Sequence, residues 1–226
     1  MIPEPANILS GPTNNFNAGK ILGIDESGKG DFFGPLVIAG VLADKSESGR
    51  LKQNGIRDSK KISDNKIIEL SNWITANFIY SIVVIGPEKY NQLYQKIRNL
   101  NKLLAWGHSR VIENIALEND IDLAVSDKFG RTDFIEKALM DKGKKIRVHQ
   151  MVRGEAVIQV AAASIVARSA FVKFIAGMRK KFDADIPKGA GSLVDAAGRE
   201  LVSRYGLSVL DRTAKVHFKN YKKIVG

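Results

Sequence analysis

The stretch GIDESGKGDFFGPLVIAG, residues 23–40, places two adjacent acids where an apolar segment ends. Residues 20–25 (KILGID) and 35–43 (PLVIAGVLA) have the short apolar patterns of buried β-strands. Between them, the glycines on either side of Lys29 permit backbone conformations and close approaches that a side chain would prevent. The stretch therefore predicts two strands joined by a glycine-rich loop, with Asp25 and Glu26 where the first strand ends.

The composition is that of a folded, basic protein. The chain has 226 residues, 44% of them hydrophobic, which is enough for one large domain or two small ones. It carries 35 Lys and Arg against 24 Asp and Glu, a formal net charge of +11. Such an excess favours a polyanionic partner, although a basic surface that only confers solubility gives the same count. Because the chain has no cysteine, a disulfide framework and a cysteine-based zinc site are excluded.

The sequence does not predict secretion or membrane insertion. No apolar run approaches the roughly 20 residues that a membrane helix needs. The opening MIPEPANILSGPTNNFNAGK is polar and does not resemble a secretory signal. We expect a cytoplasmic monomer without a membrane partner, in which residues 1–18 form a flexible arm and residues 19–226 form one domain.

Strand and helix patterns follow one another along the rest of the chain. Strand patterns recur at residues 78–86, 121–127 and 144–152. Apolar residues at helical spacing cover residues 63–78, 88–97, 99–119, 133–143, 156–182 and 195–207. Three early strands with short connections favour antiparallel pairing, whereas later strands separated by helices favour parallel pairing. We therefore predict an α/β fold with a mixed central sheet, flanking helices and a C-terminal helical segment.

Four acids fall where predicted strands end or meet helices: Asp25, Glu26, Asp127 and Glu155. Strand ends in an α/β sheet commonly line the working crevice, so neighbouring strands would bring these carboxylates together. Converging carboxylates repel one another, and either proton uptake or a hard divalent cation such as Mg²⁺ relieves that repulsion. Two such ions about 3.5–4 Å apart activate a water and stabilise the leaving oxygen in phosphodiester cleavage. Adjacent acids also occur in ordinary solvated turns. Because neighbouring residues of a strand face opposite sides, Asp25 and Glu26 can belong to the same site only where the strand ends or twists.

Six motifs occur in order across residues 23–220: GIDESGKGDFFGPLV, RDSKKIS, AVSDKFG, AAASIVARSAF, PKGAGSLVDAAG and KVHFKN. Together they resemble the type 2 ribonucleases H, and specifically ribonuclease HIII. The resemblance implies an RNase H-like catalytic domain over residues 19–226 that uses two Mg²⁺ or Mn²⁺ ions. It implies endonucleolytic cleavage of the RNA strand of RNA–DNA hybrids, leaving a 3′-hydroxyl and a 5′-phosphate. The family's catalytic and metal-binding acids correspond to Asp25, Glu26, Asp127 and Glu155.

Two positions favour ribonuclease HIII over ribonuclease HII. The fourth acid is usually Asp in ribonuclease HII and Glu in ribonuclease HIII, and Glu155 stands there. Ala190 replaces the sugar-stacking tyrosine that ribonuclease HII typically has after a Lys-Gly pair, so we expect runs of ribonucleotides to be preferred over a single one. Ribonuclease HIII normally also carries an N-terminal substrate-binding domain resembling a TATA-binding protein. Only about 20 residues precede the catalytic region here, so the chain is either truncated or a member without that domain.

Substrate contacts are expected from the glycine-rich loop and from lysines. The family's loop that matches Gly28, Lys29 and Gly30 is thought to sense the 2′-hydroxyl, which only RNA presents. Lysines within or beside the matching motifs either contact phosphates or remain solvated at the surface: Lys29, Lys60, Lys61, Lys128, Lys188 and Lys219. We expect structural or surface roles for His108 and His149, and helix packing for Ser164.

Two alternative functions stay open at this point. One is a ribonuclease HII-type enzyme that incises at single embedded ribonucleotides. The other is a non-catalytic module that binds hybrids with the same fold, against which the four acids argue.

Overall fold

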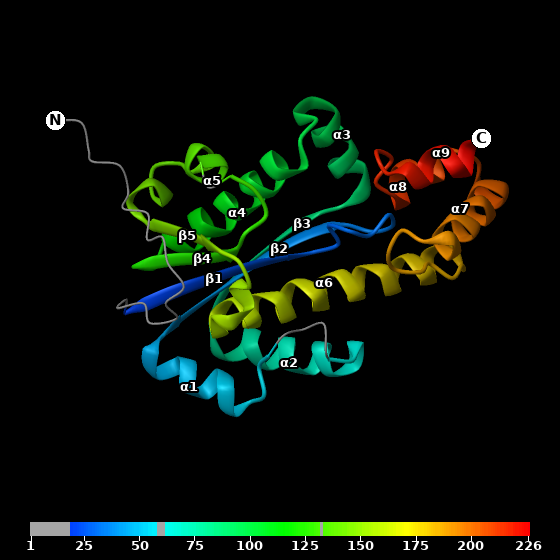
Figure 1. Cartoon of the computed structure of the whole chain (residues 1–226). Coiled ribbons are helices and arrows are strands. Elements are labelled where there is room, and N and C mark those ends of the chain that lie inside the picture. Colours follow the sequence, from blue (N-terminus) through cyan, green and yellow to red (C-terminus); the bar gives the residue numbers. More distant parts are fainter. Residues whose placement is uncertain (1–18, 58–61, 132) are drawn as a thin grey trace.

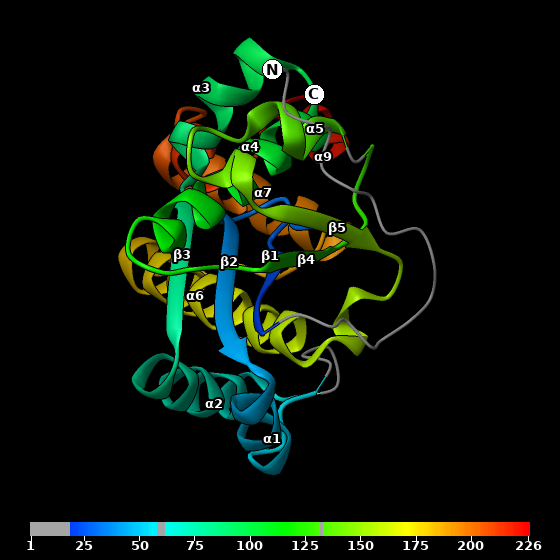
Figure 2. The ribbon, with the colours of Figure 1, turned by 90° about the vertical axis from the view of Figure 1, so that its left-hand side faces the viewer.

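The computed structural model describes residues 19–57, 62–131 and 133–226. Within these ranges the chain forms a five-stranded sheet with helices on both faces (Figures 1 and 2). The sheet order is β3-β2-β1-β4-β5, from strands β1 (Lys20–Ser27), β2 (Leu36–Asp44), β3 (Ile79–Ile85), β4 (Leu123–Asp127) and β5 (Arg147–Met151). Pairing is antiparallel from β3 through β2 to β1, and parallel from β1 through β4 to β5. The predicted mixed sheet is confirmed.

Helices form a layer on each side of the sheet (Figure 1). One layer contains α1 (Lys45–Gln53), α2 (Asp64–Asn77) and α6 (Ile158–Phe182). The other contains α3 (Pro87–Ile97), α4 (Leu100–Ala116) and α5 (Asp133–Ala138). The C-terminal segment, α7 (Ser192–Tyr205), α8 (Val209–Thr213) and α9 (Lys219–Val225), lies beyond one end of α6. Two 3₁₀ turns, η2 (Gly143–Lys145) and η3 (Gly154–Ala156), flank β5.

Strand β2 separates two apolar cores. Successive side chains of a strand point to opposite faces. Val37 and Val41 belong to the core formed with α2 and α6, whereas Ile38 and Leu42 belong to the core formed with α4. This burial on both faces explains why β2 reads as a continuous apolar run instead of an alternating one.

Helix α6 packs with its backbone almost against β1. Gly23 on β1 faces Gln159 and Val160 at the start of α6, and a Cβ at Gly23 would overlap their backbone atoms. Small residues of α6, Ala161–Ala163, are fully or nearly fully buried against the sheet. The missing side chain at Gly23 therefore sets how closely α6 approaches the strand that carries the first pair of acids.

By length and composition alone, α6 would be apolar enough to cross a membrane, which the sequence analysis did not anticipate. Its 18-residue apolar window has a mean hydropathy of 1.5, and 56% of that window is buried inside the fold. The helix packs on β1, β2 and α2. The apolar surface of α6 is thus that of a core helix.

A buried lysine fastens the C-terminal segment to the loop between β1 and β2. Lys215 is 0% exposed, and its Nζ donates hydrogen bonds of 2.8 Å to the carbonyl oxygens of Asp31 and Gly34. Burial lowers the pKa of Lys215 to about 7, partly offset by the nearby charge of Asp31. Main-chain hydrogen bonds from Lys215 to Phe32 and from Gly34 to Thr213 continue the same junction. The position of the glycine-rich loop therefore depends on a residue close to the C-terminus.

Several predicted boundaries were wrong. Strand β1 continues to Ser27 instead of ending at residue 25. Helix α1 was not predicted, because one buried leucine gives it little apolar periodicity; a capping box of Asp44 and Glu47 starts it. The helix predicted at 133–143 ends at Ala138, and the amides of Met140 and Gly143 donate to Glu113 Oε1 instead. The predicted arm at residues 1–18 lies outside the described residues.

Replacement of Gly23 by alanine is expected to lower the free energy of unfolding by about 1–3 kcal/mol, because the methyl group pushes α6 from β1. Chemical denaturation measures the change. Gly177→Ala is the matched control: it lies in α6 where an added Cβ meets nothing within 4 Å, so it should stabilise the helix by up to about 1 kcal/mol. Equal effects of the two substitutions would contradict the close-approach argument.

Candidate active site

The four predicted acids line one pocket of about 350 Å³. Asp25 and Glu26 lie on β1, Asp127 is the last residue of β4, and Glu155 lies in η3, immediately before α6. The remaining lining comes from the glycine-rich loop and from α6: Ser27, Gly28, Lys29, Gly30, Asp31, Ser164 and Arg168. The structure thus brings together the acids that the sequence analysis expected to converge.

Strand pairing and one glycine explain the convergence. β1 and β4 are parallel neighbours, with Ile24 opposite Ser126, so the next residues along both strands reach the same edge of the sheet. Gly154 packs against the end of β4, where a Cβ would lie 2.8 Å from Asp127 Cα. The Gly154 amide donates to Asp127 Oδ1 at 3.0 Å. This contact fixes the Asp127 carboxylate and places the following residue, Glu155, at the pocket.

Asp25 is an acid that resists ionisation. Burial, followed by repulsion from Glu26 and a smaller contribution from Asp127, raises the pKa of Asp25 to about 7. Hydrogen bonds from Ser164 and from the Glu26 amide, the latter 2.8 Å to Oδ1, oppose that rise without cancelling it. The sequence analysis expected Ser164 to serve only in helix packing, whereas its side chain also forms a hydrogen bond with Asp25.

Glu26, in contrast, is stabilised in its ionised form. Burial disfavours its charge, but hydrogen bonding and charge from His108 and Lys29 outweigh burial and lower the pKa of Glu26. Its Oε2 lies 3.3 Å from His108 Nε2, and its Oε1 lies 3.3 Å from Lys29 Nζ. Two adjacent carboxylates thus have pKa values that are shifted in opposite directions.

The sequence analysis did not connect His108 with the acids. His108 is 0% exposed and its ring packs against Phe129, with 4.6 Å between ring centroids. It occupies the apolar face of α4, one turn after Leu104 and one turn before Ile112. A polar residue on a buried helix face was the available signal, but its partner, Glu26, could be identified only in three dimensions.

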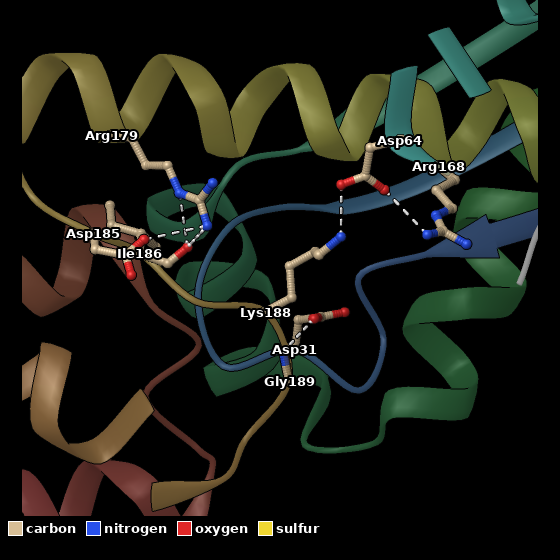
Figure 3. A network of polar contacts seen from close by, with 8 residues as sticks. All are labelled: Asp31, Asp64, Arg168, Arg179, Asp185, Ile186, Lys188 and Gly189. Carbon is tan, nitrogen blue, oxygen red and sulfur yellow. Dashed lines mark hydrogen bonds and ion pairs between the residues drawn. The ribbon is translucent and has the colours of Figure 1, made fainter. Parts of the chain in front are cut away.

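The expected substrate-binding residues fall into four groups. Gly28, Lys29 and Gly30 line the pocket. Lys188 donates to Asp64 Oδ2 at 2.7 Å, next to the pocket residue Arg168 (Figure 3). Lys219 starts α9 and Lys128 follows β4, and neither lines the pocket. Lys60 and Lys61 lie outside the described residues. Asp31 and Arg168 were not singled out from the sequence.

The donor chemistry of the pocket fits a hard divalent cation. Its acidic lining offers only carboxylate oxygens, the ligand type that Mg²⁺ and Mn²⁺ accept. The pKa of Asp25 is raised first by burial and then by repulsion from Glu26, and a bound cation would favour the charged form that both effects disfavour. Across residues 19–57, 62–131 and 133–226, no three acid or histidine side chains already stand at metal-binding spacing.

Comparison with known proteins relates most of the described chain to one family. The family model for ribonuclease HII matches residues 22–221. Ribonuclease HIII of Chlamydia pneumoniae is 45% identical over 206 residues, which are 90% of this chain and 69% of that protein. Ribonuclease HIII of Protochlamydia amoebophila is 40% identical over 218 residues, or 96% of this chain and 72% of that protein.

Solved structures agree with the sequence matches. The crystal structure of Bst-RNase HIII in complex with Mn²⁺ superposes with a TM-score of 0.83 at 30% identity, covering 91% of this chain and 69% of that one. Aquifex aeolicus RNase H3 gives a TM-score of 0.73 at 29% identity, covering 88% of this chain and 72% of that one. On this evidence the chain belongs to the type 2 ribonuclease H family, with ribonuclease HIII as the group that it resembles.

Proposed function

We propose that this ribonuclease H holds two divalent metal ions with Asp25, Glu26, Asp127 and Glu155 and cleaves the RNA strand of RNA–DNA hybrids. The observation that supports this assignment is the lining of one pocket by all four acids, beside a glycine-rich loop. Membership of the family supports the hydrolase activity, and the Mn²⁺ complex of Bst-RNase HIII supports Mn²⁺ or Mg²⁺ as the cofactor. The expected products carry a 3′-hydroxyl and a 5′-phosphate.

Each residue of the pocket has a separate task in this mechanism. When bound, the metal ions supply a water activated for attack and stabilise charge on the leaving oxygen. Asp25, Asp127 and Glu155 supply carboxylate oxygens, and the Gly154 amide fixes the direction of Asp127. Glu26 remains ionised because His108 and Lys29 hold its charge.

The glycine-rich loop is proposed to recognise ribose. Gly28 has φ +86°, and a Cβ there would overlap the carbonyl oxygen of Pro35. Gly30 has open space on its side-chain side and lines the pocket. Gly28 therefore serves the positive-φ turn of the loop, whereas the open space at Gly30 leaves room for a sugar, whose 2′-hydroxyl both donates and accepts hydrogen bonds. The loop would therefore select RNA by contacts that a deoxyribose cannot make.

Two further expectations from the sequence remain predictions. The protein is expected to act as a monomer in the cytoplasm, and residues 19–226 are expected to fold as the catalytic domain.

Asp25→Asn should reduce hybrid cleavage by at least about 10²–10³-fold, the range for removing one group that stabilises a transition state. The fold should survive, because a neutral amide avoids the repulsion that the ionised Asp25 suffers. An acid whose pKa is raised in the folded protein destabilises the fold as pH rises, for Asp25 between about pH 4 and pH 7. At pH 8 without metal, the unfolding temperature of the variant should therefore be no lower than that of the wild type. Cleavage assays and thermal unfolding test both statements. Glu118→Gln, on the exposed surface outside the pocket, is the control, and full activity of Asp25→Asn would refute the mechanism.

Mn²⁺ binding should strengthen as pH rises, because the ion must displace the proton that Asp25 holds at neutral pH. Because the pKa of Asp25 is about 7, one displaced proton should strengthen the apparent affinity about fivefold from pH 6 to pH 7 and only about twofold from pH 7 to pH 8. Calorimetric titration without nucleic acid, from pH 6 to pH 8, measures this dependence. Asp25→Asn should remove it, and a pH-independent affinity in the wild type would exclude Asp25 as the titrating ligand.

A duplex with four or more consecutive ribonucleotides should be cut much faster than one with a single ribonucleotide, because Ala190 offers no ring to stack on a sugar. Mapping of the cleavage positions on both duplexes with Mg²⁺ and with Mn²⁺ provides the measurement. Comparable rates on the two duplexes would instead support the ribonuclease HII-type alternative. Binding of the hybrid without cutting at millimolar Mg²⁺ would support a non-catalytic hybrid-binding module.

A further inference from the structure

Three charged residues from distant parts of the chain meet beside the acidic pocket (Figure 3). Asp64 is the first residue of α2, Arg168 lies on α6, and Lys188 lies in the segment between α6 and α7. Arg168 Nη2 is 3.1 Å from Asp64 Oδ1, and Lys188 Nζ is 2.7 Å from Asp64 Oδ2. One carboxylate therefore bridges two cations, using one oxygen for each.

The cluster keeps a net positive charge and is open to solvent. Lys188 and Arg168 each donate a hydrogen bond to Asp64 and each place a positive charge beside it, with the Lys188 hydrogen bond contributing most. These contacts outweigh partial burial and lower the pKa of Asp64. The side chains of Arg168, Asp64 and Lys188 are 24%, 37% and 42% exposed. An anion arriving from solvent can therefore reach both cations.

We propose that Arg168 and Lys188 bind a backbone phosphate of the hybrid, and that Asp64 occupies this phosphate site in the free protein as an internal anion. The inference rests on the proposed function in one respect, which is that nucleic acid enters the pocket of the four acids. Binding of the phosphate would displace the Asp64 carboxylate from the two cations.

The position of Arg168 supports this assignment. Arg168 follows Ser164 by four residues on α6, so the two side chains lie on the same face of the helix, one turn apart. Ser164 contacts Asp25, and both Ser164 and Arg168 line the pocket. A strand with its scissile phosphate at the acids would thus pass next to Arg168.

Lys188 is connected to the glycine-rich loop through the residue that follows it. Its neighbour Gly189 donates a 2.6 Å hydrogen bond to Asp31 Oδ1 (Figure 3). The Phe32 amide donates to the Gly189 carbonyl oxygen at 2.9 Å. Asp31 belongs to the glycine-rich loop that lines the pocket. The segment that carries Lys188 therefore keeps a fixed relation to the loop proposed to contact ribose.

Charge and energy make Asp64 a competitor of the substrate. A phosphodiester and a carboxylate each carry one negative charge and accept hydrogen bonds from Arg and Lys. Ion pairs with this exposure are weak, so displacing Asp64 costs little. Nevertheless, each arriving phosphate must displace the carboxylate from Arg168 and Lys188, so removal of the carboxylate should tighten binding.

Asp64→Asn should lower the Kd for an RNA–DNA hybrid by about threefold to fivefold, the factor expected for an exposed ion pair of this kind. Binding is measured by fluorescence anisotropy in EDTA, so that no cleavage occurs, over a series of salt concentrations. The gain should be largest at low salt. Arg168→Met and Lys188→Met should each raise Kd, and thermal unfolding verifies the fold of every variant.

A double-mutant comparison tests the masking itself. In the Arg168→Met/Lys188→Met background, Asp64→Asn should leave Kd unchanged, because no cation pair remains to be unmasked. Asp133→Asn is the matched control: Asp133 also bridges an arginine and a lysine, Arg131 at 3.0 Å and Lys137 at 2.8 Å, but it does not line the pocket. It should change Kd little.

Weaker or unchanged binding by Asp64→Asn would overturn the proposal, because Asp64 would then organise the cations or be irrelevant to binding. A gain that persists in the Arg168→Met/Lys188→Met background would also overturn it, because the effect would be one of net charge. Failure of the proposed function is distinguishable, since it would appear as hybrid binding in EDTA without any cleavage after Mg²⁺ is added.

Discussion

The close packing of α6 on β1 is the constraint on which the site depends. Where Gly23 lacks a side chain, the backbone at Gln159 and Val160 lies directly against the strand. This contact positions two parts of the pocket at once, because η3 with Glu155 precedes α6 and Ser164 lies on its second turn. β1 itself carries Asp25 and Glu26, and its parallel neighbour β4 carries Asp127. The acids are thus placed by backbone packing and strand pairing, in which small shifts are costly.

The electrostatics of the pocket are arranged unevenly around these fixed positions. His108 and Lys29 hold the charge of Glu26, whereas burial and neighbouring carboxylates discourage the charge of Asp25. A site with all four acids neutralised by fixed cations would have little affinity for metal ions. A site without any such cation would be more strongly destabilised by repulsion. The pocket instead keeps Glu26 ionised and gives Asp25 a pKa near neutral pH, so that a divalent ion can bind by displacing one proton.

Local sequence patterns predicted much of this structure. Most of the errors arose where contacts between residues far apart in the chain decide the local structure. The succession of strands along the chain, their mixed pairing and the expected convergence of the four acids followed from apolar runs and from the positions of the acids at the ends of those runs. Helix α1 was missed because a capping box, not apolar periodicity, defines it. The helix predicted at 133–143 stops early because Glu113, on another helix, accepts hydrogen bonds from two amides of the segment. The partners of His108 and Lys215 likewise lie at least 80 residues away in the chain, where no local pattern reveals them.

The two sides of the pocket are held by different physical means, and this difference bears on how a polymer could enter. The acids rest on an apolar core and on backbone contacts. The side proposed to contact the substrate is held by polar links, from the buried Lys215 to the Asp31 carbonyl oxygen, and from the Asp31 carboxylate to the segment that carries Lys188. It ends in exposed ion pairs at Asp64, which exchange partners at little cost. Metal ligands must keep their geometry throughout the reaction, whereas phosphate contacts must form and break with every substrate. Rigid packing under the acids and exchangeable ion pairs beside them therefore meet both requirements within one pocket.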